Sequence, residues 1–209
     1  MIKQQLDRFN RLDLLGHPTP LEKLDRLSSW LGRDIYIKRD DLTPLALGGN
    51  KLRKLEFHLG EALKNGVDTL ITVGGIQSNH ARLTAAVCAR LGLACELILT
   101  RSVPKADTDY ELNGNVLLDQ LFGAQMQVFA SGTDSLAKAE ARARQVTGVG
   151  AWYFAGADHI GAQLCEGHAA QWRGDESRTF DDAKAGENSC HLTCPVAARS
   201  AGSLRNSSA

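Results

Sequence analysis

The sequence predicts an α/β fold, a three-layer arrangement in which helices cover both faces of an open, mainly parallel sheet. Short apolar runs alternate with helical patterns between residues 20 and 154. These apolar runs are continuous, as in strands buried on both faces, whereas half-exposed strands alternate apolar and polar residues. The 209 residues, 43% of them hydrophobic, suffice for one large domain or for one and a half small ones.

The first half of the chain supplies two helices and two strands. Leucines recur at helical spacing after Pro20, and Asn50 is the expected N-cap of the second helix. Gly74 and Gly75 end the second strand. The expected elements are a helix at 21–31, a strand at 34–38, a helix at 52–63 and a strand at 69–73.

The same alternation continues through the second half. Gly92 and Gly123 each follow a helical pattern, in the position where glycine commonly ends a helix. The expected helices are 81–91, 112–121 and 134–145, and the expected strands are 95–99, 125–129 and 151–154. Strand–helix–strand repetition of this kind favours parallel pairing.

The last 38 residues have a different composition. Residues 172–209 contain Leu192, Val196 and Leu204 as their only Ile, Leu or Val, and they are rich in serine. A segment so poor in apolar residues gains too little from burial to offset the entropy lost on ordering. We therefore expect a disordered tail, with a boundary near residues 165–172.

Charge and composition exclude several classes of protein. Lys plus Arg and Asp plus Glu both number 24, so the formal net charge is zero and no nucleic-acid partner is expected. No apolar run reaches the roughly 20 residues of a membrane helix, so no membrane partner is expected either. The start of the chain lacks an apolar signal region, and the five cysteines are irregularly spaced. A cytoplasmic protein with reduced thiols is the expectation.

A first candidate site lies at residues 48–54 (GGNKLRK), where a loop leads into a helix. Two glycines let a backbone approach a ligand, and free N–H groups at a helix start attract anions. Lys51 and Lys54 share a helix face, and neighbouring cations favour the neutral amine that a Schiff-base lysine needs. A solvated basic first turn remains the alternative, although three cations there oppose the helix dipole. The spacing does not match a Walker loop or a dinucleotide fingerprint, which disfavours a nucleotide-binding domain.

A second candidate site joins a strand to a helix at residues 74–80 (GGIQSNH). In open α/β sheets, ligands bind beyond the carboxyl ends of strands, at junctions of this kind. Ordinary helix capping by Ser78 or Asn79 is the alternative. Capping requires one polar residue, whereas Gln77, Ser78, Asn79 and His80 are four in succession.

Other polar groups give weaker signals. Cys190, His191 and Cys194 with His168 match no standard zinc spacing, so no metal is expected. Asp40 and Asp41 are adjacent and seldom point the same way, and Arg39 beside them predicts a structural salt bridge.

Several motifs together resemble one known family. They are residues 18–22 (PTPLE), 37–41 (IKRDD), 48–57 (GGNKLRKLEF) and 75–80 (GIQSNH), continued by Gly114-Asn115 and by residues 122–124 (FGA). The chain resembles the pyridoxal-phosphate (PLP) enzymes that comprise D-cysteine desulfhydrase, L-cysteate sulfo-lyase and 1-aminocyclopropane-1-carboxylate deaminase, and its QSNH form is closer to the desulfhydrase branch. The resemblance implies the tryptophan-synthase-β-like architecture of fold type II PLP enzymes.

The resemblance also implies roles for individual residues. Lys51 matches the lysine that holds PLP as a Schiff base and then acts as the base at the substrate Cα. Asn79 matches the residue that hydrogen-bonds the ring oxygen of the cofactor, and Lys54 is expected near its phosphate. Ser78, with Gln77 and His80 beside it, matches the site of the substrate carboxylate, and Ser78 is also a candidate catalytic group. The implied reaction converts D-cysteine to pyruvate, ammonia and hydrogen sulfide.

The resemblance ends before the chain does. It is specific to about Phe129 and thins to Phe154, whereas complete relatives are longer and look like homodimers. We expect residues 1–53 to begin the large cofactor domain, 54–154 to form a small α/β domain, 155–171 to be a remnant of the large domain, which is then incomplete, and 172–209 to be a divergent tail. This pattern resembles a truncated or frameshifted reading frame. The alternatives are therefore a non-catalytic remnant, or a deaminase or sulfo-lyase acting on another small amino acid.

Overall fold

The main sheet of the computed structural model contains four parallel strands. The structure describes residues 9–105, 107–146, 150–155 and 190–193. The strands lie in the order β5-β4-β3-β6, and every neighbouring pair is parallel. Their bounds are Thr69–Gly75 for β3, Ala94–Thr100 for β4, Gln125–Phe129 for β5 and Ala151–Ala155 for β6. The predicted α/β class and the predicted parallel sheet are confirmed.

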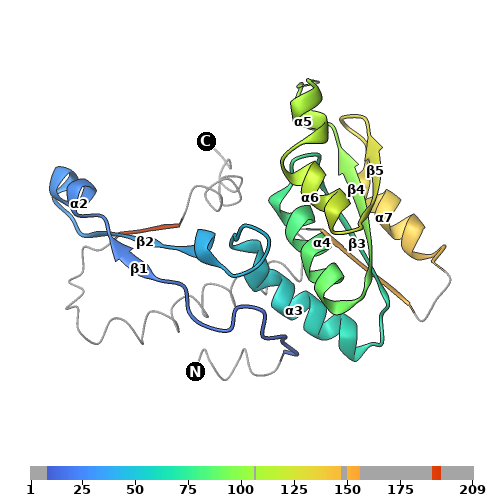
Figure 1. Cartoon of the computed structure of the whole chain (residues 1–209), viewed down its shortest axis with the longest axis horizontal. Coiled ribbons are helices and arrows are strands. Elements are labelled where there is room, and N and C mark those ends of the chain that lie inside the picture. Colours follow the sequence, from blue (N-terminus) through green and yellow to red (C-terminus); the bar gives the residue numbers. More distant parts are fainter. Residues whose placement is uncertain (1–8, 106, 147–149, 156–189, 194–209) are drawn as a thin grey trace, which may run out of the picture.

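Helices cover both faces of this sheet (Figure 1). α4 (Asn79–Leu91) packs on the strands from one side and α7 (Ser135–Ala143) from the other. α3 (Lys51–Lys64) and α6 (Asn115–Leu121) pack against α4, and α5 (Thr108–Leu112) contacts α6. Leu70 and Leu97 belong to the larger apolar cluster, which includes residues of α3 and α4. Ile71 and Ile98 instead join Ala139 of α7 in a second cluster. Because successive strand residues point to opposite faces, the two clusters mark the two buried sides of the sheet.

A second, smaller sheet is built from the N-terminal part of the chain. β1 (Leu21–Lys23) pairs antiparallel with β2 (Ile35–Lys38), and α2 (Asp25–Leu31) connects them. A short 3-10 helix, η1 (Asp40–Leu42), follows β2. Figure 1 shows β1, α2 and β2 at the end of the molecule away from the four-stranded sheet, with α3 between the two. Residues 9–49 are called the N-terminal arm below.

Two predicted helices differ from the structure. The helix expected at 21–31 begins only at Asp25, because Leu21–Lys23 pairs with β2 in a non-local contact that leucine spacing does not encode. The helix expected at 112–121 is two helices, α5 and α6. Gly114 separates them with a φ of 64°, a conformation that interrupts a helix.

The expected disordered tail needs a correction at four residues. Cys190–Thr193 forms a strand, β7, that pairs in parallel with β2. Edge pairing uses backbone N–H and C=O groups, so it does not require the apolar side chains that this segment lacks. Residues 156–189 and 194–209, which include His168 and Cys194 of the weak metal motif, lie outside the described residues.

The predicted boundary between residues 53 and 54 falls inside α3. This helix contacts both the N-terminal arm, through Glu56, and the core beneath α4, through Leu55 and Leu59. Within the described residues, no helix is long and apolar enough to cross a bilayer.

Candidate active site

The first candidate segment forms a tightly closed loop in front of Lys51. Four successive residues, Ala46 to Gly49, have positive φ angles, from 47° to 131°. The Thr43 hydroxyl accepts a hydrogen bond from the Gly49 N–H at 2.8 Å and donates one to the Gly49 carbonyl at 3.1 Å. A Cβ on Gly48 would lie 1.9 Å from the Asp41 carbonyl oxygen, so only glycine fits there. The loop fixes Lys51 as the first residue of α3.

Asn50 occupies the predicted N-cap position, but its side chain makes no capping hydrogen bond. Its backbone is helical, whereas a capping residue is normally extended. The Asn50 Oδ1 atom is buried and accepts no hydrogen bond from the described residues. A buried amide oxygen without a partner therefore lies next to Lys51.

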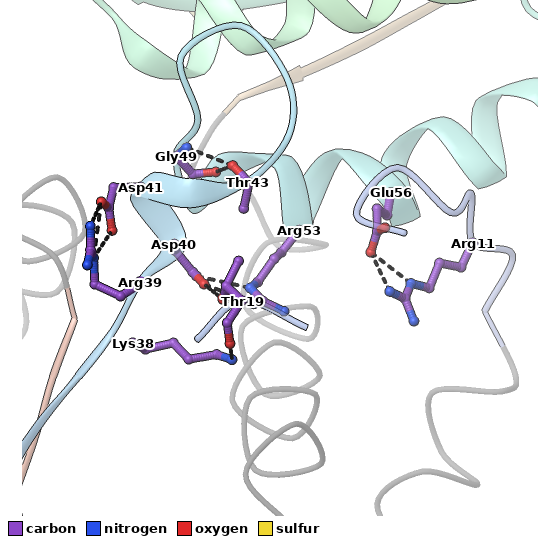
Figure 2. Close-up of polar contacts among 10 residues, drawn as sticks. All are labelled: Arg11, Thr19, Lys38, Arg39, Asp40, Asp41, Thr43, Gly49, Arg53 and Glu56. Atoms are coloured by element: carbon purple, nitrogen blue, oxygen red, sulfur yellow. Dashed lines mark hydrogen bonds and ion pairs between the residues drawn. The ribbon is translucent and has the colours of Figure 1, made fainter. Parts of the chain in front are cut away.

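A buried ion pair anchors this loop to α3 (Figure 2). Arg53 is 1% exposed, and its Nε and Nη2 atoms donate to the two Asp40 carboxylate oxygens, each at 2.9 Å. Thr19 donates to Asp40 at 2.7 Å and accepts from Arg53 at 3.0 Å, while Lys38 Nζ donates to the Thr19 carbonyl at 2.6 Å. The Asp40 carbonyl in turn accepts from the Gly49 N–H at 2.9 Å.

The sequence analysis placed Arg53 with the cations that crowd Lys51, and the structure corrects this. Because Asp40 forms a two-pronged salt bridge with Arg53, the Arg53 charge is compensated on the arm side of the helix. The salt bridge predicted for Arg39 forms with Asp41. Lys51 and Lys54 are thus the two cations of the first helical turn whose charges affect a residue of α4.

Both lysines influence His80 at the start of α4. The His80 side chain is buried, with its Nε2 atom 2.9 Å from the Thr72 hydroxyl. Burial, together with the nearby charges of His58, Lys51 and Lys54, lowers the pKa of His80 to about 3. His80 is therefore a neutral imidazole directed toward β3.

Ser78 caps α4, as one of the two interpretations predicted. Its hydroxyl accepts from the Ala81 N–H at 3.2 Å. Gly74 is required beneath it, because a Cβ there would approach the Ser78 Oγ to 2.7 Å. A capping hydroxyl keeps its own hydrogen to donate, so capping does not prevent Ser78 from contacting a ligand.

Gln77 is engaged by backbone groups of the α5–α6 connection. Its amide nitrogen donates to the carbonyls of Tyr110 and Asn113, and its amide oxygen accepts from the Asn115 N–H at 2.9 Å. Gly114 lies directly against this amide oxygen, because a Cβ added to Gly114 would be only 2.8 Å from it. These contacts hold Gln77 against the segment that begins α6.

Arg82 and Asn115, which sequence reasoning did not select as site residues, connect the two candidate segments. Asn115 Nδ2 donates to Asn79 Oδ1 and to the Gln77 carbonyl, each at 2.9 Å. The Arg82 guanidinium donates to Asn115 Oδ1 at 3.1 Å and to the Gly48 carbonyl at 2.7 Å. The Gly114-Asn115 pair in the motif set was the one signal that pointed to this contact.

The assembled site is rich in cations and hydrogen-bond donors. Lys51 and Lys54 come from α3, Arg82 and Asn79 from α4, and the Ser78 hydroxyl from the β3–α4 junction. Such a set recognises anionic oxygens, as in phosphates and carboxylates. No group of three His, Cys, Asp or Glu suited to a metal ion occurs within the described residues.

Comparisons with known proteins identify the family. A family model described as "Pyridoxal-phosphate dependent enzyme" matches residues 12–170. This chain belongs to the pyridoxal-phosphate dependent enzyme family. A D-cysteine desulfhydrase of Serratia proteamaculans is 58% identical over 127 residues, which are 61% of this chain and 38% of that protein. A D-cysteine desulfhydrase of Salmonella paratyphi B is 54% identical over 145 residues, or 69% of this chain and 44% of that protein.

Solved structures agree with the fold type II assignment. The chain is similar to a crystal structure of an ACC deaminase homologue, with a TM-score of 0.70, 36% identity, and coverage of 88% of this chain and 54% of that one. A hydrogen sulfide-producing enzyme from Fusobacterium nucleatum shares the fold, with a TM-score of 0.50 and 20% identity over 68% of this chain and 43% of that one. The chain spans 38 to 44% of the length of these curated relatives.

Proposed function

We propose that this chain carries the lysine-bearing part of a PLP-dependent lyase that acts on D-cysteine, releasing hydrogen sulfide, ammonia and pyruvate. The observation that carries the proposal is the pair of hydrogen bonds made by Arg82. Arg82 donates to the Gly48 carbonyl, three residues before Lys51, and to the Asn115 amide, which in turn donates to Asn79. The 54 to 58% identity to D-cysteine desulfhydrases supports this substrate.

The residues present fit PLP. The cofactor carries a phosphate, a ring oxygen and an aldehyde, and the site offers two lysines, an amide and a hydroxyl as partners for these groups. The unpartnered, buried Asn50 oxygen is a further polar group available beside Lys51. Lys51 would hold the cofactor covalently, Asn79 would donate to its ring oxygen, and Lys54 would face its phosphate.

Bound PLP supplies an electron sink for the negative charge that develops at the substrate Cα. The Lys51 amine would take the Cα proton as the general base. Ser78 donates to the substrate carboxylate from the N-terminus of α4, where the helix dipole also favours an anion. Gln77 and His80, which the sequence analysis assigned to the same carboxylate, act in this proposal by holding the β3–α4 junction on which Ser78 sits.

Lysine-bound PLP can be tested without turnover. The purified chain is mixed with PLP, reduced with borohydride and mapped by peptide mass spectrometry. We expect a visible absorption band before reduction and a cofactor adduct on Lys51 after it. Lys51→Ala should abolish both. Lys64→Ala, in the exposed last turn of the same helix, should leave both unchanged. Labelling of surface lysines without the Lys51 adduct contradicts the proposal, and so does a wild-type chain without the visible band.

The structural similarity to an ACC deaminase homologue favours a second candidate substrate, 1-aminocyclopropane-1-carboxylate. Sulfide and pyruvate release from D-cysteine supports the desulfhydrase assignment. Ammonia release from 1-aminocyclopropane-1-carboxylate, without sulfide release from D-cysteine, supports the deaminase. An adduct at Lys51 without either product supports a non-catalytic chain.

We also propose a cytoplasmic location and homodimer formation, which the family resemblance implies. The buried, free thiols of Cys88 and Cys95 are consistent with a reducing compartment. We further propose that residues 1–53 start the cofactor domain and that 54–154 form the small domain, with α3 shared between them.

A further inference from the structure

We propose that Arg82, acting through Asn115, fixes the Asn79 side-chain amide with its oxygen turned away from the cofactor and its nitrogen presented as a donor. The inference rests on the proposed function, in which Asn79 contacts the cofactor ring oxygen. Arg82 and Asn115 are positioning residues in this scheme, since their contacts are to Asn79 and to the Lys51 loop rather than to the reacting atoms.

The direction of the hydrogen-bond chain is set by the chemistry of Arg82. A guanidinium has five N–H donors and no acceptor. The group of Asn115 that lies 3.1 Å from Arg82 must therefore be the amide oxygen. This removes the ambiguity between oxygen and nitrogen that an isolated asparagine side chain has.

The orientation of Asn115 in turn fixes the orientation of the Asn79 amide. With its oxygen committed to Arg82, Asn115 turns its NH2 group to Asn79 and to the Gln77 carbonyl, at 2.9 Å each. A backbone carbonyl can only accept, so the Gln77 contact fixes the same orientation independently. The atom of Asn79 that meets Asn115 is consequently Oδ1, and both Nδ2 hydrogens of Asn79 are left for other partners.

The same arginine holds the loop in front of Lys51. Arg82 is 7% exposed, and its second contact, to the Gly48 carbonyl at 2.7 Å, pins the segment with positive φ angles. Asp119 of α6 lies within electrostatic reach of this buried cation. One side chain therefore sets the position of the lysine loop and the polarity of the amide, and this pre-organises a donor for a negatively charged oxygen.

Asn115→Asp tests the polarity directly. A carboxylate only accepts, so it would still receive Arg82, but it would lose the bond to the Gln77 carbonyl and would require a donor from Asn79, which would turn Asn79 Oδ1 toward the cofactor. We expect PLP affinity to fall about tenfold to hundredfold, the range for losing a hydrogen bond to a charged group. Gln120→Glu, the same change from amide to carboxylate at an exposed position of α6, controls for the added charge and should bind PLP as wild type does.

Arg82→Lys and Arg82→Met separate polarity from packing. Lysine is also a pure donor, so Arg82→Lys should retain more of the PLP affinity than Arg82→Met, which removes every donor. Thermal melts followed by circular dichroism establish that each variant is folded. Equal losses in the two Arg82 variants, or wild-type affinity in folded Asn115→Asp, would overturn the inference.

Hydrogen exchange of the side-chain amides provides a readout that needs no ligand. In the wild-type chain, NMR should show slow exchange for the Asn115 NH2 hydrogens and faster exchange for those of Asn79. In Asn115→Asp, the Asn79 hydrogens should become the slow ones. Protected Asn79 hydrogens in the wild-type chain contradict the inference. A chain that lacks the visible PLP band refutes the proposed function alone, and the exchange measurement still decides the orientation.

Discussion

The four-stranded sheet and the N-terminal arm are held by different forces. The sheet is buried by aliphatic side chains, among them Leu70, Leu97 and Leu99, which are fully shielded from solvent. The arm contributes Leu14 and Leu15 to that core, but its contacts with α3 also depend on buried charges. Apolar packing is spread over many contacts, whereas a buried charge depends on a few partners in a fixed geometry. Single substitutions should therefore affect the arm more sharply.

Glu56 is the second of these buried charges. One of its carboxylate oxygens accepts from the N–H groups of Leu14 and Leu15, at 2.9 and 3.0 Å, and the other binds Arg11 (Figure 2). It ties the start of the arm to the middle of α3. With the Arg53 pair at the start of the helix, α3 carries two polar anchors one turn apart.

The largest expected effect is at Asp40. Asp40→Ala leaves the Arg53 guanidinium buried without its carboxylate, and removing one partner of such a pair costs about 3–5 kcal/mol of unfolding free energy. The loss should appear in chemical denaturation. It should be accompanied by faster hydrogen exchange of the Gly49 amide, which donates to the Asp40 carbonyl.

A double variant serves as the control for Asp40. Combining Asp40→Leu with Arg53→Met replaces both charges by apolar groups, and this should recover much of the lost stability, because the Arg53 charge is no longer buried without its carboxylate. A single Asp40→Ala variant as stable as the wild type would show that the arm, like the sheet, is held by apolar packing.

The sequence predicted the apolar region better than the polar one. Every strand of the main sheet lies within two residues of its expected ends, since continuous Ile, Leu and Val runs report burial directly. The Arg53–Asp40 pair was missed because a charged side chain is assumed to be solvated unless its partner is known. That partner lies 13 residues earlier in the chain.

The candidate site likewise contains residues that the sequence motifs identified and one that they missed. The local motifs identified Lys51, Ser78 and Asn79, which lie where a loop or strand enters a helix. Arg82 was missed because its two partners, Gly48 and Asn115, lie 34 and 33 residues away on opposite sides of it. Spacing patterns along one helix carry no information about such contacts. Only the fold brings them together.

Asp119 sharpens the comparison, because it is a buried charge within the sheet region itself. It is fully buried, and neither carboxylate oxygen accepts a hydrogen bond from the described residues. Burial raises the pKa of Asp119 to about 7, although the nearby Arg82 charge opposes the shift. An acid whose pKa is raised on folding costs stability as the pH rises from about 4, its unfolded value, to about 7.

Asp119→Asn should therefore stabilise the chain, in contrast to Asp40→Ala. We expect a gain of about 1–3 kcal/mol above pH 7, because the amide has no charge to bury, and the gain should vanish below about pH 4, where the acid is neutral as well. Unfolding free energies at pH 4, 6 and 8 check this. A gain independent of pH would mean that Asp119 is already neutral at pH 8, and a loss at pH 8 would mean that its attraction to Arg82 outweighs its burial.

The smallest expected effect is at Asp41, the residue next to Asp40. Its carboxylate pairs with Arg39, but 33% of its side-chain surface is exposed, and Arg39 also binds Glu22. Water and salt screen such a pair, and Glu22 remains as a partner, so Asp41→Ala should leave the unfolding free energy within experimental error. Arg39 lowers the pKa of Asp41, so any contribution is present above the unfolded value of about 4 and is lost as the pH falls through the lower, folded value. Denaturation at low and high salt measures the screening, and denaturation at pH values above and below 4 measures the pH dependence. If Asp41→Ala instead destabilised the chain as much as Asp40→Ala, burial would not be what distinguishes the two neighbouring carboxylates, and the contrast between the arm and the sheet would need another cause.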